Sequence, residues 1–328
     1  MAGAEMTGRR VLVTGATGMI GAAIVRALRA RERSVRVLAR DPARARALFG
    51  STVEIAAGDL DVAESLERAC DGIGEIHHAA ALLGLQARDD KILETNVEGT
   101  RRLLAAARGR GVTRIAFTSS VAVYGDRLGR DISENAPPHP NGAYGISKVR
   151  AEALLREAAG TGVQGVMVRP CIVYGAGDRY FLPQIGRIAA LPLLPLPDGG
   201  RHLLDLVHAE DVATAHLIVM ERGRPGEAYN ATDGGSYPVR CVLRWIADAL
   251  GRSPRPLPLP RWLASALVPP ARIAGRLGGV PALAGLRRDE VDAFYTDHHF
   301  AIGKIRSLGY APRIQAREGL RAALRQSP

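Results

Sequence analysis

Two patterns of apolar and polar positions alternate along the first half of the chain. Short apolar runs bounded by turns predict six strands, and the segments between them carry apolar residues at helical spacing. This alternation is typical of a parallel sheet with helices on both faces, so we expect a doubly wound α/β domain over residues 1–170. The predicted strands are 10–14, 34–39, 53–59, 73–79, 115–120 and 163–168.

The pattern after residue 170 is less regular and predicts a smaller, mostly helical substrate lobe over 171–328, from which 203–222 return to the first domain. The prolines of 254–260 exclude a regular helix there. A helical apolar pattern over 261–279 follows, and Pro269-Pro270 is expected to interrupt it. This helical pair either packs plainly on the lobe, covers an apolar substrate as a lid, or rests on a membrane surface.

Three glycines separate the first predicted strand from the helical pattern that follows. Gly15 allows a tight turn, Gly18 lets the backbone approach a pyrophosphate, and Gly21 permits close packing of helix on strand. The N-terminus of the helix would face the phosphates of a dinucleotide. The sequence therefore predicts a Rossmann-type dinucleotide site rather than a glycine turn without a ligand. The same loop supplies Thr17, Met19 and Ile20.

The residues at the end of the second predicted strand indicate which dinucleotide the site prefers. NAD-preferring sites tend to have an acidic residue there to bind the ribose hydroxyl, whereas here Ala39 ends the strand and Arg40 follows. Because an arginine suits a 2′-phosphate, we expect NADP(H), with NAD as the alternative. Asp41 and Pro42 also fit the N-cap and first position of the next helix, and the two interpretations are compatible.

Other strand ends complete the predicted cofactor site. Asp59 and Leu60 follow the third strand, where the carboxylate either accepts a hydrogen bond from an adenine amino group or caps the next helix. Ala79 and Ala80 follow the fourth strand and are small enough for the backbone to run beneath a cofactor.

A tyrosine and a lysine four residues apart, Tyr144 and Lys148, project from one face of a predicted helix. The ammonium is expected to stabilise the phenolate and lower the tyrosine pKa from its free value of about 10. Such a tyrosine can exchange a proton with a substrate oxygen, which Ser120 could hold. The alternative is an exposed helical pair. Against it, this arginine-rich chain has only the lysines Lys91, Lys148 and Lys304.

Taken together, these motifs resemble the extended short-chain dehydrogenase/reductase family, also called the NAD-dependent epimerase/dehydratase family. The resemblance implies that Tyr144 is the catalytic acid/base, that Lys148 binds the nicotinamide ribose, and that hydride passes between the nicotinamide and a substrate carbon. A buried Asn96 could support Lys148 through a water. The matching segments are 14–21, 59–60, 76–80, 96–100, 118–125, 144–148, 169–175, 177–178, 204–211 and 308–312.

The same resemblance implies further contacts. Ser120 would orient the substrate oxygen, with Ser119 as the alternative. The nicotinamide would be bordered by Pro170, Ile172 and Val173, and the substrate would contact Leu82, Ser119 and Tyr180.

Residue 204 helps to predict the class of substrate. Nucleotide-sugar members of the family typically carry an arginine directly before the segment that begins at Asp205, but this chain has Leu204, and Arg201 is displaced. Segments 177–183 and 230–233 look more like the 3β-hydroxysteroid dehydrogenase and dihydroflavonol reductase branch. We therefore expect an oxidoreductase acting on a hydrophobic or polycyclic secondary alcohol or ketone. The alternatives are a nucleotide-sugar epimerase or dehydratase with tightly bound NAD, and a catalytically silent nucleotide-sensing protein.

The composition of the chain indicates which classes of ligand and partner it can bind. The chain of 328 residues has a formal charge of +11 that is spread along the sequence, and aromatics are 5%, which argues against nucleic acid. Attraction to anionic cofactors or to a membrane surface fits better.

The cysteines and the adjacent histidines argue against a metal site. Cys70, Cys171 and Cys241 lack metal-ligand spacing, and His77-His78 would point to opposite faces of a strand, so we expect no metal and a cytoplasmic protein with reduced cysteines. By resemblance, we expect a homodimer.

Overall fold

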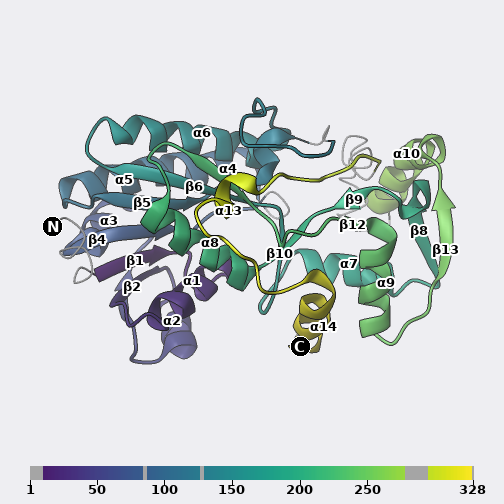
Figure 1. Cartoon of the computed structure of the whole chain (residues 1–328), viewed down its shortest axis with the longest axis horizontal. Helices are drawn as coiled ribbons and strands as arrows, with labels where there is room; N and C mark the ends of the chain where they lie inside the picture. Colours follow the sequence, from purple (N-terminus) through teal and green to yellow (C-terminus); the bar gives the residue numbers. More distant parts are fainter. Residues whose placement is uncertain (1–9, 84–86, 126–128, 278–294, 327–328) are drawn as a thin grey trace.

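The computed structural model describes residues 10–83, 87–125, 129–277 and 295–326. Figure 1 shows a sheet with helices on both faces at one end of the molecule and a smaller lobe at the other. The strands are β1 (Arg10–Thr14), β2 (Val35–Ala39), β3 (Glu54–Ala57), β4 (Ile73–His78), β5 (Arg114–Thr118), β6 (Gln164–Pro170), β7 (Ile172–Tyr174), β8 (Leu193–Pro197), β9 (Leu203–Leu204), β10 (Leu206–His208), β11 (Ala228–Ala231), β12 (Tyr237–Pro238) and β13 (Arg255–Leu259). The α-helices are α1 (Met19–Arg29), α2 (Pro42–Phe49), α3 (Ala63–Cys70), α4 (Asp89–Leu93), α5 (Gly99–Gly109), α6 (Gly142–Ala159), α7 (Phe181–Ala189), α8 (Ala209–Arg222), α9 (Val239–Ala249), α10 (Arg261–Leu277), α13 (Gly303–Arg306) and α14 (Ala316–Gln326).

The main sheet is parallel, and its strand order is β11-β6-β5-β4-β1-β2-β3. Strands β2 and β3 are added on one side of β1, and β4, β5 and β6 are added on its other side, so the order of strand addition reverses between β1 and β4. These two strands pair with Thr14 opposite His78. In open α/β sheets, ligands bind beyond the carboxyl ends of the strands at such a reversal. The predicted doubly wound fold is confirmed, and its topology locates the ligand site beside the loop that follows β1.

Apolar side chains bury both faces of this sheet. Leu28 of α1 and Leu217 of α8 belong to the core on one face. Leu66 of α3, Leu103 of α5 and Leu155 of α6 belong to the core on the other. The strands are therefore covered on both sides, which explains their nearly continuous apolar sequences.

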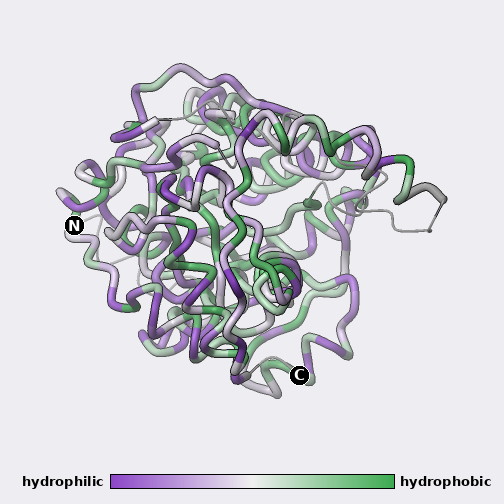
Figure 2. Tube along the Cα trace, turned by 90° about the vertical axis from the view of Figure 1, so that its right-hand side faces the viewer, coloured by the Kyte–Doolittle hydropathy of each residue, from purple (hydrophilic) through white to green (hydrophobic). Residues whose placement is uncertain are grey.

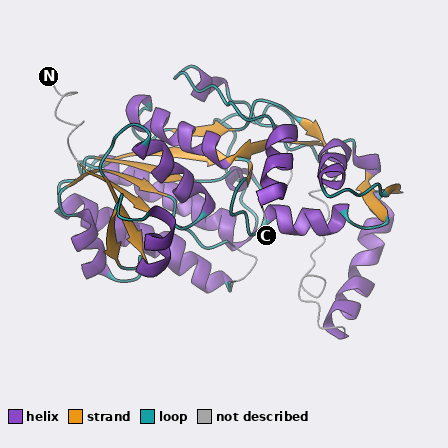
Figure 3. Ribbon diagram, turned by 90° about the horizontal axis from the view of Figure 1, so that it is seen from below, coloured by secondary structure: helices purple, strands orange, loops and turns teal. Residues whose placement is uncertain are grey.

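The C-terminal lobe has separate small cores, built around Tyr174, Ile246 and Leu320 in one place and around Leu194 and Leu243 in another. Figure 3 shows it as helices with short strands between them. The chain returns to the sheet in α8, and it does so again where β11 pairs with β6, outside the predicted returning segment. Strand β11 is short, and its place at the edge of the sheet depends on pairing with a distant strand.

Helix α10 corrects one expectation. It runs from Arg261 to Leu277 with Pro269 and Pro270 inside it, so the predicted interruption is wrong. The backbone angle that proline imposes is compatible with a helix, and the carbonyls left without a donor belong to residues 265 and 266, of which Ala266 is exposed to water. None of the helices in the described ranges combines the length and the hydrophobicity that a membrane span requires.

The two histidines of β4 have separate structural roles, as their opposite directions predict. Nδ1 of His78 lies 2.6 Å from the Thr14 hydroxyl, and Nε2 lies 3.0 Å from the Thr100 hydroxyl. His77 faces His216 on the other side of the sheet, with 3.4 Å between the Nδ1 atoms. Burial lowers the pKa of His78 to about 3, so this ring is neutral at physiological pH. In the described residues, no three His, Cys, Asp or Glu side chains gather as a metal would require.

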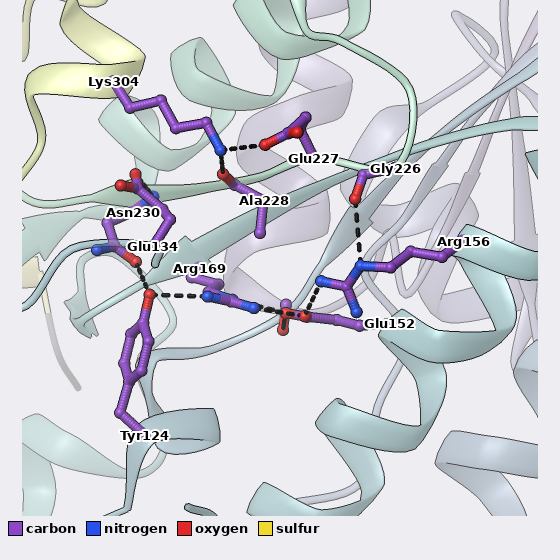
Figure 4. A network of polar contacts seen from close by, with 11 residues as sticks. Tyr124, Glu134, Glu152, Arg156, Arg169, Gly226, Glu227, Ala228, Asn230 and Lys304 are labelled. Carbon is purple, nitrogen blue, oxygen red and sulfur yellow. Dashed lines mark hydrogen bonds and ion pairs between the residues drawn. The ribbon is translucent and has the colours of Figure 1, made fainter. Parts of the chain in front are cut away.

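A buried ion pair joins strand β6 to helix α6 (Figure 4). The Arg169 guanidinium donates to both carboxylate oxygens of Glu152, at 2.8 and 2.6 Å, and to the Tyr124 hydroxyl at 2.8 Å. The Tyr124 hydroxyl in turn donates to Oδ1 of Asn230 in β11, at 2.8 Å. Because the side chains of Arg169 and Glu152 are only 3% and 2% exposed, each charge depends on the other for its stabilisation.

We expect Arg169→Met to lower the free energy of unfolding by about 3–5 kcal/mol, because it leaves the Glu152 carboxylate buried without its main partner. Urea unfolding at pH 7 measures this loss. The matched control is Arg156→Gln, since Arg156 also pairs with Glu152 at 2.9 Å but its side chain is 45% exposed. That change should cost less than about 1 kcal/mol. Equal losses in the two variants would contradict the assignment.

Candidate active site

The glycine loop has the geometry that its sequence predicts. Gly15 has a φ of +68°, and a Cβ on it would lie 2.5 Å from the backbone nitrogen of Ala80. A Cβ on Gly21 would lie 2.1 Å from the carbonyl oxygen of Gly15. The loop, the start of α1 and the segment after β4 therefore come closer together than any side chain would allow. A phosphate could approach the backbone at this point.

A cavity of about 420 Å³ lies over this loop and extends to α6. Its lining contains most of the predicted contacts. The predicted residues that line it are Gly15, Thr17, Gly18, Met19, Ile20, Gly21, Arg40, Asp59, Leu60, Ala79, Ala80, Leu82, Tyr144, Lys148 and Tyr180. The predicted residues that lie outside its described lining are Asn96, Ser119, Ser120, Pro170, Ile172 and Val173.

The end of the cavity at β2 and β3 carries two arginines. Arg40 is exposed at its edge, and Arg44, one turn into α2, is half-buried there. Nη2 of Arg44 lies 3.3 Å from the carbonyl oxygen of Thr17, so its guanidinium rests against the glycine loop. Asp41 caps α2 by accepting from the backbone N–H of Arg44 at 3.0 Å, and Pro42 begins that helix. The interpretation of Asp41 as the N-cap and of Pro42 as the first residue of α2 is therefore confirmed.

Asp59 also lies in this part of the cavity. Helix α3 begins after Val62, which is its N-cap and contributes no side-chain hydrogen bond. Asp59 is thus not the cap of that helix. Its Oδ1 accepts from the backbone N–H of Asp61 at 3.4 Å, and the side chain is half-buried at the cavity wall.

Tyr144 and Lys148 lie one turn apart on α6, at the other end of the cavity. The Lys148 side chain is almost fully buried, and its Nζ donates to the carbonyl oxygen of Thr118 at 2.8 Å. The same nitrogen lies 5.6 Å from the centroid of the Tyr144 ring. This hydrogen bond connects α6 to the carboxyl end of β5, so the tyrosine is held beside the loop that follows Thr118.

The electrostatics of this pair correct the sequence-based expectation. Burial raises the pKa of Tyr144 to about 12, and a hydrogen bond with Ser120 opposes that shift. Burial also lowers the pKa of Lys148 to about 7, while the charge of Glu152 opposes it. The expected lowering of the tyrosine pKa by Lys148 is therefore wrong for this structure, because loss of hydration raises that pKa and the opposing interaction comes from Ser120.

Asn96 lies within a π-helical turn, Glu94–Glu98, between α4 and α5. Its Oδ1 accepts from the N–H of Leu82 at 2.8 Å, and its Nδ2 donates to the Leu82 carbonyl and to Oγ of Ser147, each at 3.0 Å. The side chain thus connects the cavity wall to α6, and its hydrogen bonds among the described residues go to Leu82 and Ser147 rather than to Lys148. Such π turns often occur at functional sites. Asn96 is a positioning residue for Leu82 and for the helix that carries Tyr144.

The two serines after β5 point in different directions. The hydroxyl of Ser119 is buried and donates to Glu152 at 2.6 Å, so Ser119 is not available to a substrate. Ser120 lies beside Tyr144, and its Oγ accepts from the N–H of Ala122 at 3.1 Å, at the start of the 3₁₀ turn Val121–Tyr124. The expected preference for Ser120 fits this arrangement, whereas the alternative, Ser119, does not.

The predicted nicotinamide border is not part of the described cavity lining. Ile172 and Val173 belong to β7, which pairs with β10 through Leu206 and Val207. Both are half-buried and pack against neighbouring cores. Pro170 ends β6 and is buried. Residues 172–174 form strand pairs with β10, which is distant in the sequence. The local sequence does not reveal such pairing.

Several lining residues were missed. They are Leu38, Ala39, Asp41, Arg44, Gly58, Ala81, Leu83, Thr95, Thr118, Gly177, Asp178 and Arg179. Arg44 could have been found, because it lies four residues after Arg40 on a helix that Asp41 caps. Asp178 shapes the rim of the cavity, since its carboxylate accepts from the N–H groups of Tyr180, Phe181 and Leu182 at 2.8, 3.0 and 3.0 Å.

Known proteins share both the sequence and the fold of this chain. The model of the NAD dependent epimerase/dehydratase family matches residues 11–232. The chain is 35% identical over 245 residues to 4-hydroxy-2-methyl-3-oxo-4-farnesyl-3,4-dihydroquinoline-1-oxide ketoreductase of Stigmatella aurantiaca, which covers 74% of this chain and 73% of the relative. It is 30% identical over 341 residues to 3 beta-hydroxysteroid dehydrogenase/Delta 5-->4-isomerase of Mycobacterium tuberculosis, with 96% and 89% covered.

Among solved structures, the UDP-glucose 4-epimerase of Thermus thermophilus in complex with NAD superimposes with a TM-score of 0.75 at 26% identity. The match covers 97% of this chain and 98% of that one. The family model spans more than half of the chain, and its glycine loop, Tyr144 and Lys148 meet at one cavity. The chain therefore belongs to the NAD-dependent epimerase/dehydratase family, the extended short-chain dehydrogenases/reductases that its motifs predict, and it is an enzyme of that family.

Proposed function

We propose that this enzyme transfers a hydride between NADP(H) and an apolar secondary alcohol or ketone. The observation that carries the proposal is the position of Tyr144 and Lys148 at one end of a cavity whose other end is lined by Arg40 and Arg44. A proton donor and a dinucleotide site thus share one space. Members of the family carry out several reactions, and the details of this cavity favour net reduction or oxidation.

The cofactor preference is supported by the two arginines beside β2. Guanidinium groups recognise phosphates through charge-assisted hydrogen bonds. Arg40 and Arg44 line the cavity beside the end of β2, where NADP(H) would bring its 2′-phosphate, and the strand ends at Ala39 without a carboxylate to bind the ribose hydroxyls. The close packing of Gly15 against Ala80 leaves the loop accessible to a pyrophosphate, so the residues present fit a bound dinucleotide.

The residues around Tyr144 suit proton donation. With a pKa of about 12, its hydroxyl is protonated at neutral pH and can give a proton to the carbonyl oxygen of a ketone as that oxygen gains charge. Bound at this cavity, the reduced nicotinamide would supply the hydride to the carbonyl carbon. Ser120 would hold the substrate oxygen, and Lys148, whose pKa of about 7 lets it gain or lose a proton, would stabilise the tyrosinate that remains. Oxidation of an alcohol would reverse these roles.

An apolar substrate is supported by the remaining wall of the cavity. Ala81, Leu82 and Leu83 form a continuous apolar segment there, and Tyr180 faces the same space. The ketoreductase and hydroxysteroid dehydrogenase relatives are named for reactions of this class. Leu204, which stands where nucleotide-sugar enzymes typically carry an arginine, is half-buried, and Arg201 pairs with Asp198 at 3.1 Å.

A nucleotide-sugar epimerase is the second candidate, and the likeness to the Thermus UDP-glucose 4-epimerase favours it. Such an enzyme uses its cofactor transiently and releases no reduced cofactor. Leu204 weighs against it, because that side chain offers no charge to a diphosphate.

Tyr144→Phe should lower kcat for ketone reduction by about 10²–10⁴-fold while NADPH still binds, because the change removes only the proton donor. Steady-state kinetics and fluorescence titration with NADPH measure the two effects. Tyr180→Phe makes the same chemical change at another tyrosine of the cavity and should alter kcat little. Unchanged turnover by Tyr144→Phe would refute the mechanism.

Arg40→Ala and Arg44→Ala should each weaken NADPH binding by about tenfold or more, because each removes a charge-assisted hydrogen bond to the 2′-phosphate. NADH, which lacks that phosphate, should lose much less affinity. Isothermal titration with both cofactors gives the comparison, and Arg46→Ala on the exposed side of α2 serves as the control. Equal weakening of NADPH and NADH would overturn the NADP(H) assignment.

A further inference from the structure

The outward face of α10 is apolar. Trp262 is 72% exposed and Ile273 is 58% exposed, although large hydrophobic side chains are normally buried. Ala266 and the pair Pro269-Pro270 are also exposed and lie between them. The spacing 262, 266, 269, 270, 273 is that of one helical stripe. Water-facing helices normally show the opposite pattern, with charged residues outward.

The inner face of the same helix accounts for its attachment to the lobe. Ala264 and Val268, on the side opposite to the stripe, are 6% and 3% exposed. Figures 1 and 3 place α10 at the end of the lobe that is far from the main sheet. No residue of α10 belongs to the described lining of the active-site cavity, so the structure gives no support to the lid interpretation.

The surroundings of α10 extend the apolar surface. Among the described residues, the exposed large hydrophobic side chains lie mostly in this lobe. Those of the lobe are Leu191, Leu193, Leu250, Leu257, Trp262, Leu267 and Ile273, and those elsewhere are Leu48 and Val62. Leu193 and Leu257 belong to the paired strands β8 and β13, which lie beside α10 in Figure 1. Figure 2 looks onto this end of the molecule and shows hydrophobic residues recurring along α10 at its upper edge.

The segment that contains β13 and α10 carries charge of one sign. Residues 249–277 contain no Asp or Glu. They contain the arginines Arg252, Arg255, Arg261, Arg272 and Arg276. Of these, Arg272 is exposed and lies one position before Ile273 on the helix. An apolar stripe beside an exposed arginine is complementary to an anionic lipid surface, where the stripe enters the headgroup boundary and the guanidinium of Arg272 reaches the phosphates.

We propose that α10 and the adjoining β8–β13 edge dock the enzyme on an anionic phospholipid membrane. In this arrangement α10 lies in the plane of the interface, with Trp262 and Ile273 at the boundary between headgroups and acyl chains. The proposal rests on the proposed function in one respect, since an apolar substrate would be concentrated in the same membrane. The arginines of this segment fit an anionic membrane better than a second copy of the chain, which would have to bring like charges together.

Vesicle sedimentation tests the docking directly, without any substrate. The chain of 328 residues should pellet with phosphatidylglycerol vesicles and remain in the supernatant with phosphatidylcholine vesicles. Trp262→Ser with Ile273→Ser should reduce binding by about tenfold or more, because two apolar side chains no longer leave water. Arg272→Gln should reduce it by roughly fivefold. The controls are Leu48→Ser, another exposed apolar side chain, and Arg29→Gln, which removes the same charge from α1.

Tryptophan fluorescence identifies the contacting helix. The chain has two tryptophans, and Trp245 packs against Tyr237 with 5.2 Å between ring centroids, so Trp245→Phe leaves Trp262 as the reporter. Its emission should shift to shorter wavelength on addition of phosphatidylglycerol vesicles. NADPH-dependent turnover of a water-soluble ketone by every variant separates this test from the proposed function, because docking residues lie outside the cavity.

Absence of binding to anionic vesicles would overturn the proposal, as would equal binding by the wild type and the Trp262→Ser, Ile273→Ser variant. A dimer in sedimentation velocity that this variant abolishes, without vesicle binding by the wild type, would assign the same face to a second copy instead.

Discussion

One face of helix α6 carries the interactions on which the active site depends. Tyr144, Lys148 and Glu152 follow one another at intervals of four residues, so they form a single row. The first lies beside Ser120, the second donates to the Thr118 carbonyl, and the third accepts from Ser119 and Arg169. The row therefore fastens the carboxyl end of β5 at three successive positions. A shift of α6 relative to the sheet would disturb all three contacts together.

Burial decides the chemistry of this row. If the two groups were in water, the ammonium of Lys148 would stabilise the phenolate of Tyr144 and lower the pKa of the tyrosine. In this structure loss of hydration is the larger effect on both groups, so the pKa of Lys148 falls to about 7 and that of Tyr144 rises to about 12. A protonated tyrosine beside a lysine with a pKa of about 7 fits the proposed reduction of a carbonyl. The third member, Glu152, stays charged because, despite burial, Arg169 holds its pKa below the usual value.

The sequence predicted the features that depend on local spacing. The glycine loop, the cap at Asp41 and the Tyr144–Lys148 row are set by residues within a few positions of each other. The features that the sequence did not predict depend on distant partners: Asn96 reaches Leu82 and Ser147, Ser119 turns toward Glu152, and Ile172 pairs with Leu206. A local pattern also could not reveal the sign of the pKa shifts, because burial is a property of the assembled fold.

The most direct test of the proposed hydride transfer uses NADPH that carries deuterium at both C4 positions and follows the label into product, with trans-1-decalone and long-chain ketones as substrates. The account predicts that one deuterium appears on the carbinol carbon for each NADPH consumed. Failure of every ketone to take up deuterium, together with interconversion of UDP-glucose and UDP-galactose without NADPH consumption, would contradict it and identify the enzyme as an epimerase.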